Sequence, residues 1–263
     1  MKKYLKTKLE FSIETLERLI KIVNLDKESD KVKFETWLAN EYKLLEFIDK
    51  KKTITFRYAN LSDLKKVVNI KQIDNNEKFK EWFSYKYKLS DDENNFLLSL
   101  IKKHRLSIVN YNETKLVVKF IGQILNKIDF DTEYFTDWYG HKMTCKLNGY
   151  TFNGEPDFAV ATGIEVPETP YFFLQEYKKS VNPSGNPEYQ VLAAMLAAIE
   201  KNKTNTIKGG YIIGAYWKFM ILEKLENGNY EYFVSDGFEA LNFEHLKKIY
   251  IYLQAVKYLY CKY

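Results

Sequence analysis

Cysteine, histidine, proline and arginine are all scarce in this chain of 263 residues. The two cysteines, Cys145 and Cys261, are far apart and form no C-x-x-C pair, which argues against a zinc ribbon or a disulfide scaffold and predicts free thiols. The three histidines are scattered over different predicted elements, and no H-E-x-x-H motif occurs. We therefore interpret the histidines as surface or hydrogen-bonded residues rather than as zinc ligands.

Long hydrophobic runs are also missing. No stretch approaches the ~20 uninterrupted apolar residues of a membrane helix, and Lys8 and Glu10 interrupt any apolar signal region, so we expect a cytoplasmic protein without a membrane partner. The net charge of +5 permits nucleic-acid binding without requiring it. Because only Arg18, Arg57 and Arg105 are arginines, the composition gives no support to an arginine-based surface for reading bases.

The N-terminal part of the chain is free of helix breakers, because all five prolines lie within residues 156–187. Apolar residues at a spacing of three to four predict an amphipathic helix over residues 4–23. Ser90 and Glu93 have the spacing of a capping box and predict the start of another helix. These patterns predict a mainly helical region over residues 1–105, which would contact substrate or a partner.

The rest of the chain, residues 106–263, has a mixed α/β pattern. Apolar residues at helical spacing predict a helix over residues 112–128. Asn148-Gly149 is a strong signal for a hairpin turn between two strands. Asn186-Pro187 offers the first residues of a later helix. The predicted order is a helix at 112–128, strands at 133–146, 149–162 and 171–179, a helix from 186, and a strand at 211–217.

Acidic and basic residues flank two of these strands. Asp157 follows Pro156 at the start of one strand, and Glu176 and Lys178 lie two residues apart near the end of the next. Side chains alternate along a strand, so Glu176 and Lys178 face the same way. If the strands pair, Asp157 joins them, and two carboxylates beside an amine suit a hard divalent cation such as Mg²⁺.

Pro156-Asp157 followed by Glu176-Tyr177-Lys178 resembles the motif of the PD-(D/E)xK nuclease superfamily. The resemblance covers roughly residues 106–263 and implies a restriction-endonuclease-like αβββαβ core, with a central mixed sheet flanked by helices. The predicted element order agrees with that core, and it is almost independent of the motif letters. An identical tripeptide, Glu41-Tyr42-Lys43, lies in a helical pattern without a preceding Pro-Asp, so we interpret it as a solvated helix face.

The resemblance implies a metal-dependent nuclease that acts on DNA, although nothing in the residues excludes RNA. Asp157, Glu176 and the backbone carbonyl of Tyr177 would hold Mg²⁺ or Mn²⁺. Lys178 would position or deprotonate the attacking water, or stabilise the charged transition state. Family members that cut both strands often act as dimers, so a homodimer is compatible with this interpretation.

Two further residues have a functional and a structural interpretation. Glu113 lies on the inward stripe of the helix at 112–128 and is a candidate additional metal ligand, or else an acid favoured by the helix N-terminus or a capping partner of Asn110. Gln190 resembles a frequent companion of the motif, or is an ordinary solvent-facing residue. We interpret Glu155, close to Asp157, as an exposed charge and not as a site residue.

A second class of function is a catalytically silent nuclease-fold protein that serves as a nucleic-acid-binding or regulatory module. The intact set of Asp157, Glu176 and Lys178 argues against this alternative, because a protein without turnover has no chemical need for all three.

Overall fold

The computed structural model describes residues 36, 40, 52–178 and 185–261, and the helix expected over residues 4–23 lies outside them. The chain divides into two compact units, Met1–Lys52 and Thr53–Tyr263. The second unit therefore begins well before the boundary expected near residue 105. The reason is tertiary pairing, because segments from residues 53–105 add strands to sheets formed by the rest of the unit.

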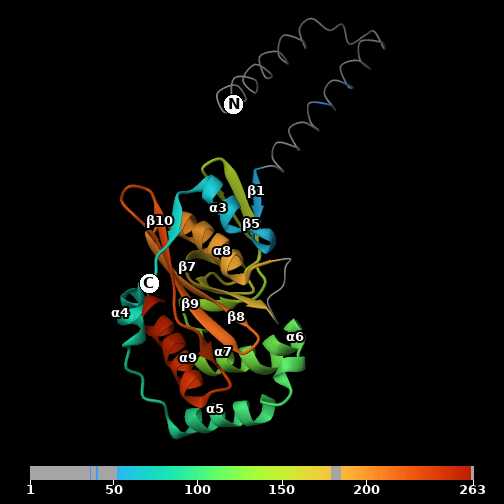
Figure 1. Cartoon of the computed structure of the whole chain (residues 1–263), viewed down its shortest axis with the longest axis vertical. Helices are drawn as coiled ribbons and strands as arrows, with labels where there is room; N and C mark the ends of the chain where they lie inside the picture. The colour runs from blue at the N-terminus through green and yellow to red at the C-terminus, as the bar shows by residue number, and fades with distance from the viewer. Residues whose placement is uncertain (1–35, 37–39, 41–51, 179–184, 262–263) are drawn as a thin grey trace, which may run out of the picture. The chain divides into compact units, whose positions relative to one another are not determined.

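An eight-stranded mixed sheet forms the centre of the second unit (Figure 1). Its strands follow the order β2-β10-β9-β8-β7-β6-β3, and β11 pairs with β9. The pairs β7–β8 and β10–β2 are parallel and the others are antiparallel, which confirms a mixed α/β class. The strands are β2 (Ile70–Gln72), β3 (Thr136–Trp138), β6 (Phe158–Thr162), β7 (Glu168–Lys178), β8 (Thr206–Ile213), β9 (Tyr216–Lys224), β10 (Tyr230–Val234) and β11 (Phe238–Glu239).

A second, three-stranded sheet has the order β1-β5-β4 and contains β1 (Thr53–Thr55), β4 (Met143–Leu147) and β5 (Tyr150–Gly154). The hairpin predicted at Asn148-Gly149 is confirmed, and both residues have positive φ, as a primed turn requires. The long strands predicted at 133–146 and 149–162 are each divided between the two sheets. Breaks fall near Gly140, which has φ +59, and at Pro156, which has no N–H to donate to a ladder.

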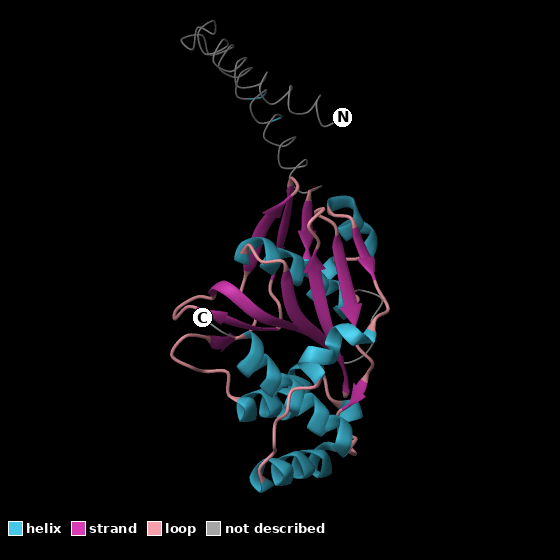
Figure 2. Ribbon diagram, turned by 90° about the vertical axis from the view of Figure 1, so that its left-hand side faces the viewer, coloured by secondary structure: helices cyan, strands magenta, loops and turns pink. Residues whose placement is uncertain are grey.

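Helices cover both faces of the large sheet (Figures 1 and 2). The predicted capping box is confirmed, since the Ser90 side chain accepts from the Glu93 N–H and the Glu93 side chain accepts from the Ser90 N–H. The predicted helix at 112–128 is continuous but contains one π-helical segment, η4. The helices are α3 (Leu61–Val67), α4 (Lys80–Phe83), α5 (Asp91–His104), α6 (Glu113–Leu116), α7 (Gly122–Ile128), α8 (Pro187–Asn202) and α9 (Phe243–Ala255), with η1 (Phe56–Tyr58), η2 (Asn76–Phe79), η3 (Ile108–Asn110), η4 (Val117–Ile121) and η5 (Val256–Tyr260).

The two faces of the sheet bury different cores. On one face, α4, α5, α7 and α9 enclose an aromatic cluster around Trp82, whose indole N–H donates to the carbonyl of Tyr252. On the other face lies α8, whose many buried alanines allow it to pack closely on β7 and β8. None of the helices within the described ranges combines the length and apolarity needed to cross a bilayer.

Candidate functional site

The pairing of β6 with β7 brings the predicted acids together. The strands are antiparallel, with Phe158 opposite Gln175, so the preceding residue Asp157 lies opposite Glu176. The backbone N–H of Tyr177 donates to Asp157 Oδ2 at 2.7 Å. This hydrogen bond fixes the Asp157 carboxylate beside the end of β7.

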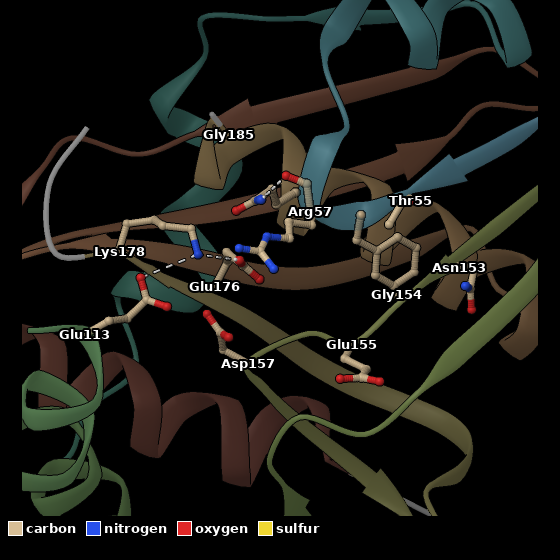
Figure 3. A pocket seen from close by; sticks show the side chains of 12 residues that line it. Thr55, Arg57, Glu113, Asn153, Gly154, Glu155, Asp157, Glu176, Lys178 and Gly185 are labelled. Atoms are coloured by element: carbon tan, nitrogen blue, oxygen red, sulfur yellow. Dashed lines mark hydrogen bonds and ion pairs between the residues drawn. The ribbon is translucent and has the colours of Figure 1, made fainter. Parts of the chain in front are cut away.

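Lys178 lies at the centre of the acidic group. Its Nζ is 3.1 Å from Glu176 Oε1 and 3.6 Å from Glu113 Oε2. Glu176 and Lys178 share a strand face, as their spacing predicts, whereas Glu113 reaches the group from the first turn of α6. The N-cap of α6 is Asn112 and not Asn110, so Glu113 is not a capping partner of Asn110. It does lie in the first turn of α6, where the helix N-terminus favours an acid. Figure 3 shows the carboxylate of Asp157 directed toward the same group.

Three carboxylates, those of Glu113, Asp157 and Glu176, surround the single ammonium of Lys178. This excess of negative charge contributes to raised pKa values in the group. Burial and the nearby Asp157 raise the pKa of Glu176 to about 8, although Lys178 acts in the opposite direction. Burial also raises the pKa of Asp157, against the lowering effects of the Tyr177 N–H and Lys178. Burial lowers the pKa of Lys178, but Glu176, Asp157 and Glu113 together raise it above its usual value. Lys178 is therefore an ammonium at neutral pH.

Tyr177 lies on the opposite face of β7 and is fully buried in the aromatic core. Its hydroxyl donates to Gln175 Oε1 at 3.1 Å. The side chain of Tyr177 is thus committed to packing. Only main-chain atoms of Tyr177 can therefore face a site on the side of Glu176.

Gln190 is buried in the first turn of α8, which excludes the solvent-facing alternative. The predicted start of this helix is confirmed, with Asn186 as N-cap and Pro187 as the first helical residue. Gln190 Nε2 donates to the backbone carbonyl of Arg57, while its Oε1 has no hydrogen-bond partner among the described residues. Buried acceptors are usually paired, so we expect an ordered water at Gln190 Oε1.

These residues line an open cleft of about 520 Å³. Its wall also contains residues for which the sequence analysis assigned no role, above all Arg57 in η1. Glu155 is exposed, as expected, but it lines the cleft. It lies in the segment between β5 and β6, and Figure 3 shows its carboxylate directed away from that of Asp157. The lining residues are Thr55, Phe56, Arg57, Glu113, Asn153, Gly154, Glu155, Asp157, Glu176, Lys178, Gly185 and Gln190.

Cysteine and histidine lie outside this cleft. Cys145 and Cys261 are free thiols, as predicted. His104 is buried and its Nδ1 lies 2.7 Å from the hydroxyl of Tyr111, so it is a hydrogen-bonded core residue. The cleft therefore offers oxygen donors and not the nitrogen and sulfur donors that zinc prefers.

The donor set fits a hard divalent cation, because Asp157 and Glu176 supply carboxylate oxygens to the cleft. The described residues contain no ready-made cluster of three or more His, Cys, Asp or Glu ligands. In this structure the ammonium of Lys178 provides the positive charge beside the carboxylates of Glu176 and Glu113.

The chain matches no model of a known protein family, and no curated protein matches its sequence. The interpretation of the cleft consequently rests on the residues and geometry described above.

Proposed function

We propose that this chain is a metal-dependent nuclease of the PD-(D/E)xK type that hydrolyses phosphodiester bonds in DNA. The observation that carries the proposal is the meeting of Asp157, Glu176 and Lys178 in one open cleft, with Lys178 Nζ 3.1 Å from Glu176. Carboxylates and a lysine of this kind are the groups that metal-assisted phosphodiester hydrolysis requires.

The arrangement of elements supports a restriction-endonuclease-like core. The helix formed by α6, η4 and α7 precedes β3, β6 and β7, and α8 and β8 follow them. β6 is antiparallel to both of its neighbours, whereas β7 and β8 are parallel. This order and pairing agree with an αβββαβ core in which the small sheet of β4 and β5 is an insertion.

Asp157 and Glu176 would hold Mg²⁺ or Mn²⁺, with the backbone carbonyl of Tyr177 as a third donor. The cation would lower the pKa of a bound water and polarise the phosphate. Glu176 must lose its proton to become a ligand, so cation binding would release protons near neutral pH. Because the neighbouring carboxylates raise its pKa, Lys178 is suited to act as a cation that orients the water or stabilises the phosphate oxygens.

The charge of the chain and the family resemblance indicate the substrate class. The net charge of +5 is compatible with a polyanionic substrate. The preference for DNA and a homodimer are carried over from the family resemblance.

The test is cleavage of supercoiled plasmid with Mg²⁺ or Mn²⁺, in the presence and absence of EDTA. Asp157→Asn is the decisive variant, because an amide oxygen can still accept from the Tyr177 N–H while the charge is removed. We expect it to lower cleavage roughly 10³-fold, the loss expected when metal-based stabilisation of several kcal/mol is removed. Asp92→Asn is the matched control, since Asp92 pairs with Lys127 at 2.6 Å outside the cleft.

Three results are informative. Metal-dependent cutting that Asp157→Asn abolishes and Asp92→Asn preserves would support the proposal. Cutting that survives Asp157→Asn would refute the assignment of the site. DNA binding without cutting by the wild type would favour the catalytically silent nuclease-fold module.

A further inference from the structure

The short turn η1 is held firmly at the wall of the cleft. It follows β1, which pairs in parallel with β5. The Phe56 ring is buried against Gly154, where an added Cβ would lie only 2.5 Å from a ring carbon. On its other side, the carbonyl of Arg57 accepts from Gln190 Nε2. The backbone of η1 is thus fixed from both β5 and α8.

Gly185 leaves room for the hydrogen bond between Gln190 and the Arg57 carbonyl. A Cβ at Gly185 would lie 2.8 Å from Gln190 Nε2 and 2.9 Å from the Arg57 carbonyl oxygen. These distances are too short for a methyl group, so glycine allows the hydrogen bond to form. Gln190 is therefore a positioning residue for η1, and it acts through the backbone of Arg57.

The side chain of Arg57 is exposed and extends into the cleft (Figure 3). Its guanidinium carbon lies 5.8 Å from the ring centroid of Tyr58. It forms no ion pair with a carboxylate of the described residues, although Glu113, Asp157 and Glu176 line the same cleft. Its donors are consequently available to an anion that enters.

Lys178 is the other cationic residue of the described cleft wall, and Glu176 and Glu113 engage its ammonium. A nucleic-acid backbone entering this cleft meets an excess of carboxylates, which repel it. The Arg57 guanidinium, which extends from a fixed backbone, opposes that repulsion and matches the geometry of two phosphate oxygens.

We propose that Arg57 binds a backbone phosphate of the nucleic-acid substrate in this cleft, an inference that rests on the proposed nuclease function. The anion class is a phosphodiester, because the proposed function brings a nucleic-acid backbone into this cleft and its two non-bridging phosphate oxygens match the parallel donors of a guanidinium. Arg57 would be a substrate-binding residue, and Gln190 and Gly185 would position it.

The test is DNA binding in EDTA, where the proposed cleavage cannot proceed. We expect Arg57→Ala to weaken binding about tenfold or more, the usual effect of losing a charge-assisted bidentate contact. The plot of log association constant against log salt concentration has a negative slope. Its magnitude should decrease by about 0.9, as for one lost phosphate contact. Arg57→Lys should restore the slope but only part of the affinity, since lysine keeps the charge without the planar donors.

Arg105→Ala is the matched control, because Arg105 is an exposed arginine at the end of α5 and does not line the cleft. Arg105→Ala removes the same charge, but its salt-dependence slope should lie closer to that of the wild type than the slope of Arg57→Ala does. If Arg57→Ala and Arg105→Ala have equal affinities and equal slopes, the inference is wrong.

Gly185→Ala tests the positioning role. It should weaken DNA binding in the wild-type background but have little further effect when combined with Arg57→Ala. Additive losses would overturn the proposal that this contact acts through Arg57.

The two proposals fail separately. If the wild type cuts DNA with metal and Arg57→Ala binds DNA normally, the phosphate-binding role of Arg57 is wrong and the nuclease proposal stands. A wild type that does not cut, but whose DNA affinity depends on Arg57, would retain the phosphate site and remove the nuclease function.

Discussion

Two glutamate–lysine pairs of this chain have similar geometry and opposite electrostatics. Lys178 pairs with Glu176 at 3.1 Å, and Lys224 pairs with Glu200 at 2.5 Å. The two glutamate side chains retain only 9% and 22% exposure. Burial and Asp157 raise the pKa of Glu176 to about 8. Burial also acts to raise the pKa of Glu200, but its hydrogen bonds bring that pKa below its usual value.

The difference lies in the neighbours of each pair. Glu200 accepts from both Lys224 and the hydroxyl of Tyr230, so its charge is well satisfied. Lys178 must balance Asp157 and Glu113 as well as Glu176. An ion pair that serves only stability avoids such surplus charge, whereas a cation-binding site needs it. The number of carboxylates per ammonium, and not the ion pair itself, marks the candidate site.

The largest expected contrast is in DNA cleavage. Lys178→Ala should lower metal-dependent cleavage about 100-fold or more, the lower range for a group that transfers or orients a reacting proton. Lys224→Ala removes an equivalent lysine from the other pair and should leave cleavage unchanged. Rates on a plasmid substrate measure both, with circular dichroism as a check on folding. Equal losses in the two variants would erase the proposed distinction between the pairs.

The next contrast is in the pH dependence of stability without metal. The folded-state pKa of Glu176 lies above the unfolded value, so its contribution is fully present below about pH 4.5 and is lost as pH rises through about 8. Between about pH 5 and pH 9, the wild type should lose roughly 4 kcal/mol more unfolding free energy than Glu176→Gln. Urea unfolding in EDTA measures this. Parallel curves would contradict the raised pKa.

Glu200 should behave with the opposite sign. Its folded-state pKa is lowered, so its contribution is present above the unfolded pKa and is lost as pH falls through the folded value. Glu200→Gln should therefore destabilise the protein at neutral pH, with a cost that shrinks under acidic conditions. The same urea series measures it. A cost that grows on acidification would show that the pair does not favour the carboxylate.

The smallest effect is expected from Glu113. Its side chain is 47% exposed and lies 3.6 Å from Lys178, so it is less desolvated than Glu176. Glu113→Gln should raise the Mg²⁺ concentration that gives half-maximal cleavage by about tenfold. This is the lower end of the range for groups that support metal ligands. A Mg²⁺ titration of the cleavage rate measures this. A loss as large as that of Asp157→Asn would make Glu113 a full ligand instead.

Local patterns predicted much of the candidate site. A proline that interrupts a ladder before Asp157, and two residues at a spacing of two near the end of β7, were sufficient to predict a shared location. The start of α8 was readable because Asn186 and Pro187 satisfy the chemistry of a helix N-terminus. These predictions succeeded because strand alternation and capping depend on neighbours in sequence.

Other features could not be read in this way. The division of residues 133–162 between two sheets depends on which partners each segment finds, and the boundary near residue 105 failed to anticipate that β1 and β2 join distant strands. Arg57 carried no local signal of a role. Its place in the cleft follows from the β1–β5 pairing and from the hydrogen bond of its carbonyl to Gln190.

By itself, the sequence determined the elements that bear Asp157, Glu176 and Lys178 and the strand face that the last two share, because backbone geometry and local hydrogen bonding act over a few residues. Only the tertiary structure decided that Glu113 and Arg57 reach the same cleft, and that Glu176 is a raised-pKa acid while Glu200 is not. The physical reason is that burial and the electric field at a carboxylate are sums over groups that are distant in the chain and close in space.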